Sequence, residues 1–392
     1  MTPEAGLAIA RMIGHITYLS QEAMTRKFDI DRLKPRQIAT EFEKIFSVGS
    51  YLGYQGERFV ERFDANSYIA ISMAMDLFDM GATPATLADA LRPAASCRWL
   101  VASFTSDWLF PPAQSRDLVK ALIANRAPVT YCEIDSTCGH DAFLLPDNFA
   151  TYGEMIRAFI ANLAGQTHAG IPVSDEDAND PTSVFRQQRL DYDRLAALIP
   201  TTATVLDLGC GSGGLLERLR QEGRRRLVGL DLDETRVLAA TRRGLDVIQA
   251  DLNAGLGAFA TREFDYVVLS QTLQTVKDVE GLIDEMLRVG RTCIVSFPNL
   301  AYHRLRQMLS REGRSPKAAG LLRYEWYNTP NIRFCSLTDF DEFCQRKNIR
   351  VCRRIGLDTE IGVEVLDEPN LNADLAIFVI ARVGRSTDHL PL

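Results

Sequence analysis

The chain has 392 residues, of which 46% are hydrophobic and 24% are charged, and its formal net charge is −7. This length predicts two or three domains with ample apolar core, and the negative charge argues against nucleic acid or an anionic membrane as the main partner. No apolar run reaches the roughly 18 residues of a membrane span, the N-terminus lacks signal-peptide features, and no two cysteines form a C-x-x-C pair. These features predict a reduced cytoplasmic protein that binds small molecules.

The first half opens with helical periodicity. Apolar residues recur at spacings of three to five residues, as in Leu7, Met12, Ile16 and Leu19. This pattern continues to about residue 80, and from Arg98 the order changes to strand, helix, strand and helix. That order is what the cap and the last βα units of an α/β-hydrolase fold would give. The predicted elements are helices at 6–28, 50–63, 67–80, 114–125 and 148–163, and strands at 98–104 and 129–134.

An acid and a histidine follow the two predicted strands. Asp107 stands in "FTSDWLFPP" and His140 in "CGHDAFLLP". This is the order of the last two members of a Ser…Asp…His triad, in which the acid fixes the histidine tautomer and the histidine takes the serine proton. The nucleophile of such a triad lies in G-x-S-x-G, but no serine here has glycine at both −2 and +2, and Ser212 has only Gly214.

A polar, acidic stretch divides the chain. The segment "AGQTHAGIPVSDEDANDPTS" (164–183) cannot bury enough apolar area to offset its ordering entropy, so it is typical of a linker. We therefore predict domains over 1–165 and 189–383, joined by an acidic linker over 166–188 and followed by a tail over 384–392.

Strands and helices alternate in the second half. This alternation predicts a mostly parallel, doubly wound sheet. The last two strands are joined by a segment with no obvious helix, so we expect an antiparallel edge there. The predicted strands begin near residues 204, 226, 246, 264, 292, 351 and 375.

A glycine-rich turn, "VLDLGCGSGGLLERL", joins the first of these strands to a helix. Gly209, Gly211 and Gly214 fit G-x-G-x-x-G, and Asp231 follows at the end of the next strand, so a dinucleotide site is one alternative. However, Asp207 would face a pyrophosphate there, and like charges in a partly dry crevice repel by several kcal/mol as an order of magnitude.

S-adenosylmethionine suits these acids better, because it carries a sulfonium and an amino group and no phosphate. Asp231 can accept from ribose hydroxyls, and Asp251 in "QADLN" from the adenine amino group. The arrangement resembles the class I S-adenosylmethionine-dependent methyltransferase fold. A dinucleotide enzyme and a turn that binds nothing stay open as alternatives.

Three further strings, "FDYVVLSQTLQTV", "VSFPNLAYHRLR" and "YEWYNTPNIRFCSLTDF", resemble the methionine-biosynthesis protein MetW family over residues 190–382. The family implies no firm methyl acceptor, no compelling general base stands out, and His303 and Tyr327 are candidates only. The resemblance implies that S-adenosylmethionine or S-adenosylhomocysteine binds at Asp207, Gly209, Cys210, Gly211, Gly213, Asp231, Leu232, Asp251, Leu252 and Ser270.

Four strings of the first half, "ARMIGHITYLS", "YQGERFVERFDANSYI", "SDWLFPPAQS" and "GHDAFL", resemble the homoserine O-acyltransferase (MetX-like) family, which has the α/β-hydrolase fold. The resemblance covers residues 2–163 and implies that Asp107 is the triad acid, His140 the triad base, and Asp141 a substrate contact. Arg11 is a weaker candidate for substrate contact. We expect the serine to lie on sequence that this chain does not contain.

These resemblances predict a partial α/β-hydrolase fold fused to a methyltransferase-like domain that supports or regulates the acylation of homoserine. One alternative is a methyltransferase whose acceptor lies near residues 324–331. Another is an acetyl- or succinyltransferase that works with a complementary chain carrying the nucleophile, and only then would acyl-CoA bind.

Overall fold

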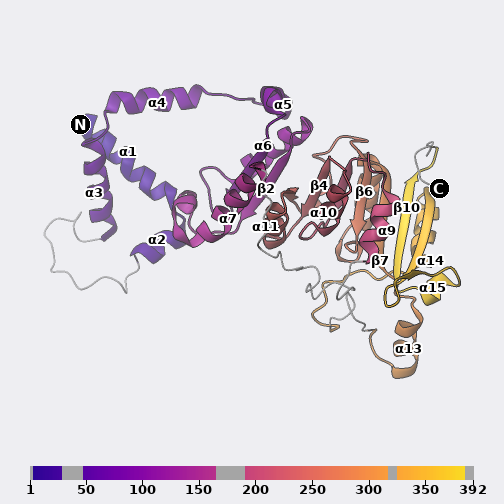
Figure 1. The fold of residues 1–392 in the computed structure, drawn as a ribbon. Coiled ribbons are helices and arrows are strands. Elements are labelled where there is room, and N and C mark those ends of the chain that lie inside the picture. Colours follow the sequence, from indigo (N-terminus) through magenta and orange to yellow (C-terminus); the bar gives the residue numbers. More distant parts are fainter. Residues whose placement is uncertain (1–2, 29–46, 165–189, 317–324, 385–392) are drawn as a thin grey trace. The chain divides into compact units, whose positions relative to one another are not determined.

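The computed structural model describes residues 3–28, 47–164, 190–316 and 325–384 (Figure 1). The chain forms two compact units, Met1–Pro128 with Glu133–Ile156, and Val129–Cys132 with Arg157–Leu392. The predicted linker lies outside the described residues, as does the predicted tail except for Gly384. Within the described ranges, no helix has the length and apolar character needed to cross a membrane.

The first half follows the predicted order of helices and then strand–helix–strand–helix. N-cap hydrogen bonds set the first residue of several helices. For example, the Asp64 carboxylate caps α4 by accepting from the N–H of Ser67 at 2.7 Å. The elements are α1 (Pro3–Tyr18), α2 (Gln21–Phe28), α3 (Ser47–Val60), α4 (Ala65–Leu77), α5 (Pro84–Leu91), η3 (Arg92–Ala94), β1 (Trp99–Phe104), α6 (Pro112–Ala124), β2 (Val129–Ile134), η4 (His140–Leu144) and α7 (Pro146–Leu163).

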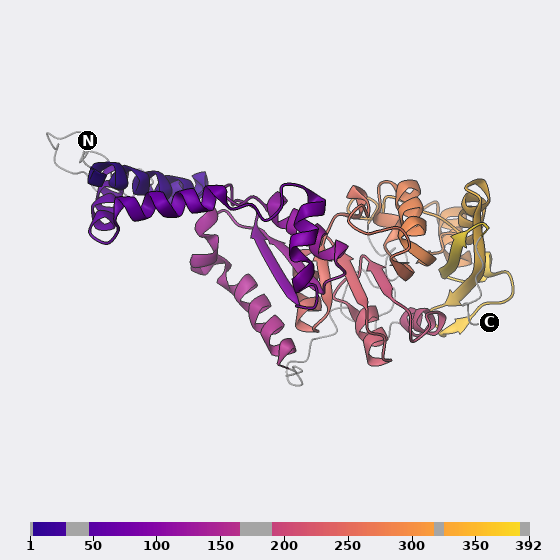
Figure 2. The same ribbon diagram turned by 90° about the horizontal axis from the view of Figure 1, so that it is seen from above.

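The helices at the N-terminus bury less than their periodicity predicts. Helix α1 contacts α3 and α4, and the indigo helices lie together in Figure 2. Leu7 is buried, but Ile16 is 47% exposed and Leu19 falls after the end of α1, so the expected apolar face is only partly correct. Helix α4 carries apolar residues on more than one side and has no buried residue, although a helix of this kind is normally buried.

The second unit alternates strands and helices as predicted, and all seven expected strands are present. The elements are α9 (Leu190–Leu198), β3 (Val205–Leu208), α10 (Gly214–Gln221), β4 (Leu227–Asp231), α11 (Glu234–Arg242), β5 (Asp246–Gln249), η5 (Leu252–Ala254), β6 (Phe264–Ser270), η6 (Leu273–Thr275), α12 (Val279–Val289), β7 (Gly290–Pro298), α13 (His303–Glu312), α14 (Leu337–Arg346), β8 (Ile349–Asp358), β9 (Val363–Glu364), α15 (Pro369–Asn372) and β10 (Leu375–Arg382).

The sheet of this unit runs in the order β5-β4-β3-β6-β7-β10-β8-β9. The strands from β5 to β7 are parallel, which confirms the doubly wound, methyltransferase-like fold class. The expected antiparallel edge is confirmed, because the last two predicted strands, β8 and β10, pair antiparallel at this end of the sheet. Strand β10 lies between β7 and β8 and is antiparallel to both. Seven of its eight residues are buried, as an inner strand requires, whereas β8 exposes Arg353 and Arg354.

Aromatic side chains fill the core beside this inner strand. The ring of Phe378 in β10 stacks on Phe297 of β7 at 5.8 Å between centroids, and it lies 4.8 Å from Phe340 of α14. Each of these side chains is at most 3% exposed. The cluster holds α14 on the sheet and fixes the carboxyl end of β7, where a candidate site lies.

Candidate functional site

The predicted acid and base of the first unit meet. His140 Nδ1 lies 2.9 Å from Asp107 Oδ2, and the other oxygen, Oδ1, accepts from the N–H groups of Leu109 and Phe110 at 3.1 and 2.9 Å. Asp107 is 8% exposed. An ionised carboxylate only accepts, so the bonded nitrogen of His140 carries the proton and Nε2 is the basic atom.

Aromatic rings surround this histidine. Tyr18, Phe110 and Phe143 place their rings 5.1 to 5.7 Å from the imidazole centroid. Nε2 of His140 has no hydrogen-bond partner among the residues that the structure describes. The ring is therefore oriented on one side and left open on the other, which is the arrangement that a general base needs.

Gly139 brings the end of α1 against the histidine loop. Its φ is +78°, and a Cβ at this position would lie 2.4 Å from the backbone nitrogen of Ser20 and 2.8 Å from the carbonyl oxygen of Tyr18. Its N–H donates to the Ser106 hydroxyl at 2.9 Å. A glycine before His140 is required because no side chain fits at this close approach.

The two predicted substrate contacts lie near a histidine that the sequence analysis did not single out. Burial lowers the pKa of His15, and the charges of Arg11 and Lys27 lower that pKa further, whereas Asp141 opposes them. The His15 Nδ1 lies 3.1 Å from the Tyr51 hydroxyl. The Arg11 guanidinium sits over the Phe59 ring at 5.2 Å.

Spacing could have identified this group. Arg11, His15 and Tyr18 are four and three residues apart, so they share one face of α1. Asp141 follows the catalytic candidate His140 directly, and both electrostatic and ring contacts link η4 to this face of α1. This face of α1 carries cationic, imidazole and hydroxyl groups, and η4 adds the Asp141 carboxylate beside the acid–base pair.

In the second unit, the glycine-rich turn joins β3 to α10 and depends on its glycines. Gly209, Gly211 and Gly213 all have positive φ, at 70°, 57° and 86°. A Cβ on Gly209 would lie 2.4 Å from the Thr272 hydroxyl, and one on Gly213 would lie 2.3 Å from Leu245 Cδ1. The turn therefore tolerates no side chain at either position.

Asp231 at the end of β4 holds this turn. Its Oδ2 accepts from the N–H of Gly211 at 2.8 Å, and its Oδ1 accepts from the N–H of Asp233 at 3.0 Å. Asp207 at the end of β3 is only 2% exposed. The two predicted acids therefore flank the turn from neighbouring parallel strands.

The other predicted positions stand on the ends of β4, β5 and β6. Leu232 is 62% exposed, and Asp251 caps the segment that contains Leu252 by accepting from the N–H of Asn253 at 2.9 Å. The Ser270 hydroxyl lies 3.1 Å from that of Ser296. Cys210 is buried within the turn, and its sulfur would be 2.6 Å from a Cβ on Gly229.

These residues fit a nucleoside cofactor. The hydroxyl of Ser212 is buried and has no hydrogen-bond partner within the described part of the chain, so the turn offers a polar atom as well as a backbone cradle. Acids at the ends of β3, β4 and β5 suit amino and hydroxyl donors rather than phosphate. Clusters of His, Cys, Asp or Glu that could hold a metal ion do not occur among residues 3–28, 47–164, 190–316 and 325–384.

Two candidates from the sequence do not join this site. His303 begins α13, and its Nδ1 faces the carbonyl oxygen of Leu371 at 3.3 Å. Tyr327 is 70% exposed and packs edge-on against Trp326. The sequence analysis missed Gln271, which follows β6 at φ +51° and donates to the Asp191 carboxylate at 2.6 Å. A glutamine directly after a buried strand is the signal that could have found it.

Comparison with known proteins agrees with both resemblances. Residues 189–380 match the model of the family described as methionine biosynthesis protein MetW. A bifunctional methionine biosynthesis protein MetXA/MetW of Rhodopirellula baltica is 48% identical over 98% of this chain, which covers 61% of that protein. A homoserine O-succinyltransferase of Ralstonia nicotianae is 50% identical over 43% of this chain and 41% of its own length.

The chain therefore spans about three-fifths of the first relative and two-fifths of the second. A solved structure described as an S-adenosylmethionine-dependent methyltransferase from Thermotoga maritima covers 49% of this chain and 87% of its own, with 15% identity and a TM-score of 0.37. The predicted resemblances are confirmed: a homoserine O-acyltransferase-like region is fused to a MetW region.

Proposed function

We propose that this chain acts in methionine biosynthesis, with its MetW region binding S-adenosylmethionine and supporting the acylation of homoserine by the acyltransferase-like region. The observation that carries the proposal is the 2.9 Å contact between His140 Nδ1 and Asp107 Oδ2, in an aromatic setting that leaves Nε2 open. It supports a role for the first unit in acyl transfer. Because both regions belong to one chain, the nucleoside-binding unit would have a high effective concentration at the acyltransferase-like site.

The chemistry asked of the acid–base pair is proton transfer. His140 Nε2 would take the proton of an attacking serine hydroxyl and later return one to the leaving thiolate, while Asp107 stabilises the imidazolium. The serine would come from a complementary segment that carries G-x-S-x-G, and acyl-CoA would bind only in its presence. Asp141 and Arg11 would contact homoserine. The charges of both residues act on the pKa of His15, so both lie close to this histidine.

Helix α4 supports the proposal of a complementary segment. Ile69, Ile71, Met73, Met75 and Leu77 are each more than 50% exposed. At helical spacing, Ile69, Met73 and Leu77 share one side of α4, and Ile71 and Met75 lie on another. Exposed apolar residues on more than one side favour a protein–protein contact that covers the helix. The proposed partner is an acyltransferase chain or fragment that covers this surface and supplies the nucleophile.

The second unit would hold the cofactor at the glycine-rich turn. Asp231 would accept from the ribose hydroxyls, Asp251 from the adenine amino group, and Asp207 from the amino group of the methionine part. The bound cofactor would supply an electrophilic methyl group or, in a regulatory module, only its shape and charge. A cytoplasmic location stays a prediction.

Calorimetry tests the cofactor. We expect S-adenosylmethionine and S-adenosylhomocysteine to bind the full chain, and Asp207→Asn to weaken both. NADH is the comparison ligand, and tight NADH binding without heat from either nucleoside would refute the proposal.

A reconstitution assay tests the acyl transfer. The chain alone should not turn over homoserine with acetyl- or succinyl-CoA, whereas addition of a G-x-S-x-G segment of a homoserine acyltransferase should restore turnover. His140→Ala should abolish the restored activity. Turnover by this chain alone, or restored turnover that survives His140→Ala, would contradict the proposed roles.

Methyl transfer is the second candidate function. One observation favours it. Asn331, in the segment expected to face an acceptor, lines a small pocket together with Leu273. The preceding residue, Thr272, places its side chain beside Gly209 of the glycine-rich turn. Tyr324, at the other end of that segment, lies outside the described residues. Transfer of a labelled methyl group from the cofactor into a cell extract would support an enzyme, and cofactor binding without transfer would support a binding module.

A further inference from the structure

Gln271, the residue directly after β6, joins the candidate nucleoside site to helix α9. Its side-chain amide donates from Nε2 to Oδ2 of Asp191 at 2.6 Å. Asp191 stands in the first turn of α9 and is 0% exposed. A hydrogen bond from an amide to a buried carboxylate is stronger than one between two neutral groups. This bond therefore holds the first turn of α9 against the carboxyl end of β6.

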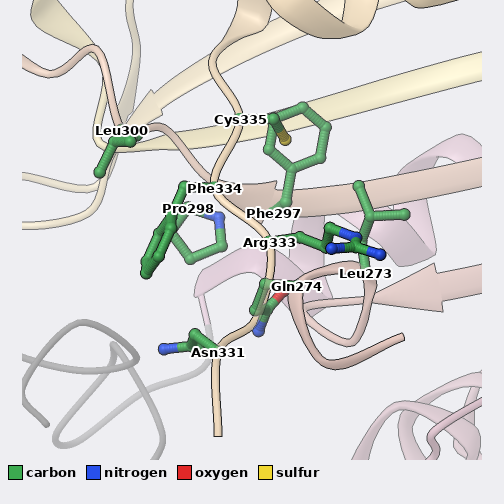
Figure 3. A pocket seen from close by; sticks show the side chains of 9 residues that line it. All are labelled: Leu273, Gln274, Phe297, Pro298, Leu300, Asn331, Arg333, Phe334 and Cys335. Atoms are coloured by element: carbon green, nitrogen blue, oxygen red, sulfur yellow. The ribbon is translucent and has the colours of Figure 1, made fainter. Parts of the chain in front are cut away.

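The backbone of Gln271 is held in a conformation that glutamine rarely adopts. Its φ is +51°, in the left-handed region. Its N–H donates to the carbonyl oxygen of Ser296 in β7 at 2.9 Å, and its own carbonyl oxygen accepts from Gln274 Nε2 at 2.6 Å. Gln274 lies in η6, beside the segment that carries Asn331 and Arg333 (Figure 3). A left-handed residue of this kind persists where its surroundings hold it, and such residues gather at ligand clamps and switches.

The two neighbours of Gln271 belong to the candidate nucleoside site. Ser270 is one of the residues predicted to bind the cofactor. Thr272 lies against the glycine-rich turn, since a Cβ on Gly209 would meet the Thr272 hydroxyl at 2.4 Å. That hydroxyl also donates to the carbonyl oxygen of Ser270 at 3.0 Å. Because Gln271 links these two residues, its bond to Asp191 bears on the position of both.

A different residue fastens the other end of α9. The Arg224 guanidinium, which is 3% exposed, donates to the carbonyl oxygens of Ala196, at 2.8 Å, and of Ile199. A cation at the end of a helix satisfies carbonyl groups that have no partner within the helix. Loss of the bond between Gln271 and Asp191 should therefore free the first turn of α9 and leave the last turn in place.

We infer that Asp191 and Gln271 are a positioning pair that couples nucleoside binding to the first turn of α9. The inference rests on the proposed nucleoside site and adds how that site is held. With the bond made, Ser270 and Thr272 keep the positions that the nucleoside requires. Linkage is reciprocal, so a pair that strengthens nucleoside binding must itself be stabilised by the nucleoside to the same extent. Nucleoside binding would thereby fix the helix that directly follows the predicted linker.

Calorimetry with S-adenosylhomocysteine on the full chain tests the coupling. Gln271→Met removes the donor, and Gln271→Asn suits the left-handed backbone but is one methylene too short to reach Asp191. Both should lower the affinity about tenfold, the size expected when one hydrogen bond to a charged group is lost. Gln345→Met, at an exposed position on α14, is the matched control and should bind like the wild type. If Gln271→Met does not fold, Gln271→Asn decides, and wild-type affinity in it would overturn the inference.

A reciprocal exchange separates the bond from other effects of these substitutions. Gln271→Glu sets two carboxylates against each other and should weaken S-adenosylhomocysteine binding at least about tenfold. Adding Asp191→Asn restores one donor and one acceptor on side chains of the same lengths, with the net charge of the wild type. The affinity should then return to within about threefold of the wild type. A double variant that binds no better than Gln271→Glu would contradict a direct role of the bond.

Hydrogen exchange reports on the helix itself. In the wild type, S-adenosylhomocysteine should slow exchange in the first turn of α9, and in Gln271→Asn it should slow this exchange less. The last turn, held by Arg224, should exchange alike in both proteins. Equal slowing of the first turn in both would overturn the coupling. A wild type that binds no nucleoside would reject the proposed function, whereas normal wild-type binding with unaffected variants would reject this inference alone.

Discussion

The backbone N–H of Gly211 donates to Oδ2 of Asp231 at 2.8 Å, so one hydrogen bond joins the glycine-rich turn to the end of β4. Asp231 Oδ1 accepts from Asp233 N–H, and Asp231→Ala would leave both donors without this partner. We expect a loss of about 1–3 kcal/mol in the free energy of unfolding. Nucleoside affinity should fall at least about tenfold, the equivalent of 1.4 kcal/mol.

Asp233→Ala is the matched control. Asp233 caps α11 by accepting from the N–H of Arg236 at 3.1 Å, so its loss should cost about 0.5–2 kcal/mol of stability. Nucleoside affinity should stay near that of the wild type, because the turn itself is intact. If both variants lose affinity equally in calorimetry, Asp231 has no special part in the site.

Gly209→Ala should destabilise the second unit. The added Cβ would lie 2.4 Å from the Thr272 hydroxyl at a φ of +70°, and we expect a cost of about 1–3 kcal/mol. Thr272→Ala should relieve part of this cost in the double variant, because it removes the two nearest atoms. Gly257→Ala, with nothing within 4 Å of the added Cβ, should change stability by less than about 0.5 kcal/mol in urea unfolding. Equal losses in the two glycine variants would contradict the packing argument.

Sequence patterns predicted the sheet of the second unit well, because each buried strand is a short apolar run between turn signals. They also predicted the pairing of Asp107 with His140, since residues that follow neighbouring strands meet at one edge of a sheet. They also predicted the antiparallel pairing of the last two of these strands. They did not give the order of the two strands, because that order depends on which faces are covered, and the burial of β10 shows that it lies inside.

The sequence could not predict the burial of Gln274. This residue lies in a short 3-10 segment, where its side chain donates to the carbonyl oxygen of Gln271 and its own carbonyl oxygen accepts from the N–H groups of residues 332 and 333. Periodicity also overestimated the burial of α1, because it reports which residues share a face and not whether anything covers that face. Leu7 is buried, whereas Ile16, nine residues further along α1 and so on its opposite side, is 47% exposed.

The tautomer of His140 gives a direct test of the acid–base pair. Because the Asp107 carboxylate accepts from Nδ1, the neutral ring should carry its proton there, and long-range ¹⁵N–¹H NMR should show this. In Asp107→Asn the side-chain amide can donate to Nδ1 instead, so the proton should move to Nε2. His303, whose Nδ1 faces the carbonyl oxygen of Leu371, should be unchanged. An Nε2 proton in the wild type would refute the assignment.

His15 should make the stability of the first unit depend on pH. Its pKa in the folded state lies below the ordinary value of 6.5, mainly because of burial and then because of Arg11. The unfolded chain therefore binds the proton first, so this contribution is complete above pH 6.5 and is lost as the pH falls toward the folded pKa. In urea unfolding between pH 8 and pH 5, His15→Gln should show a weaker decline than the wild type. A parallel decline in both proteins would exclude His15 as the source.

The thiol of Cys335 should resist alkylation in the folded chain. Burial, with a smaller contribution from Asp339, raises its pKa to about 12, so at pH 8 only about one molecule in ten thousand carries the reactive thiolate. Cys97 is exposed, and iodoacetamide should modify it first, as peptide mass spectrometry would show. Cys344, whose pKa is also raised to about 12, lies on the buried face of α14 and is the internal comparison. Both should react only after unfolding. Rapid native modification of Cys335 beside an unreactive Cys344 would contradict the burial that raises the pKa of Cys335.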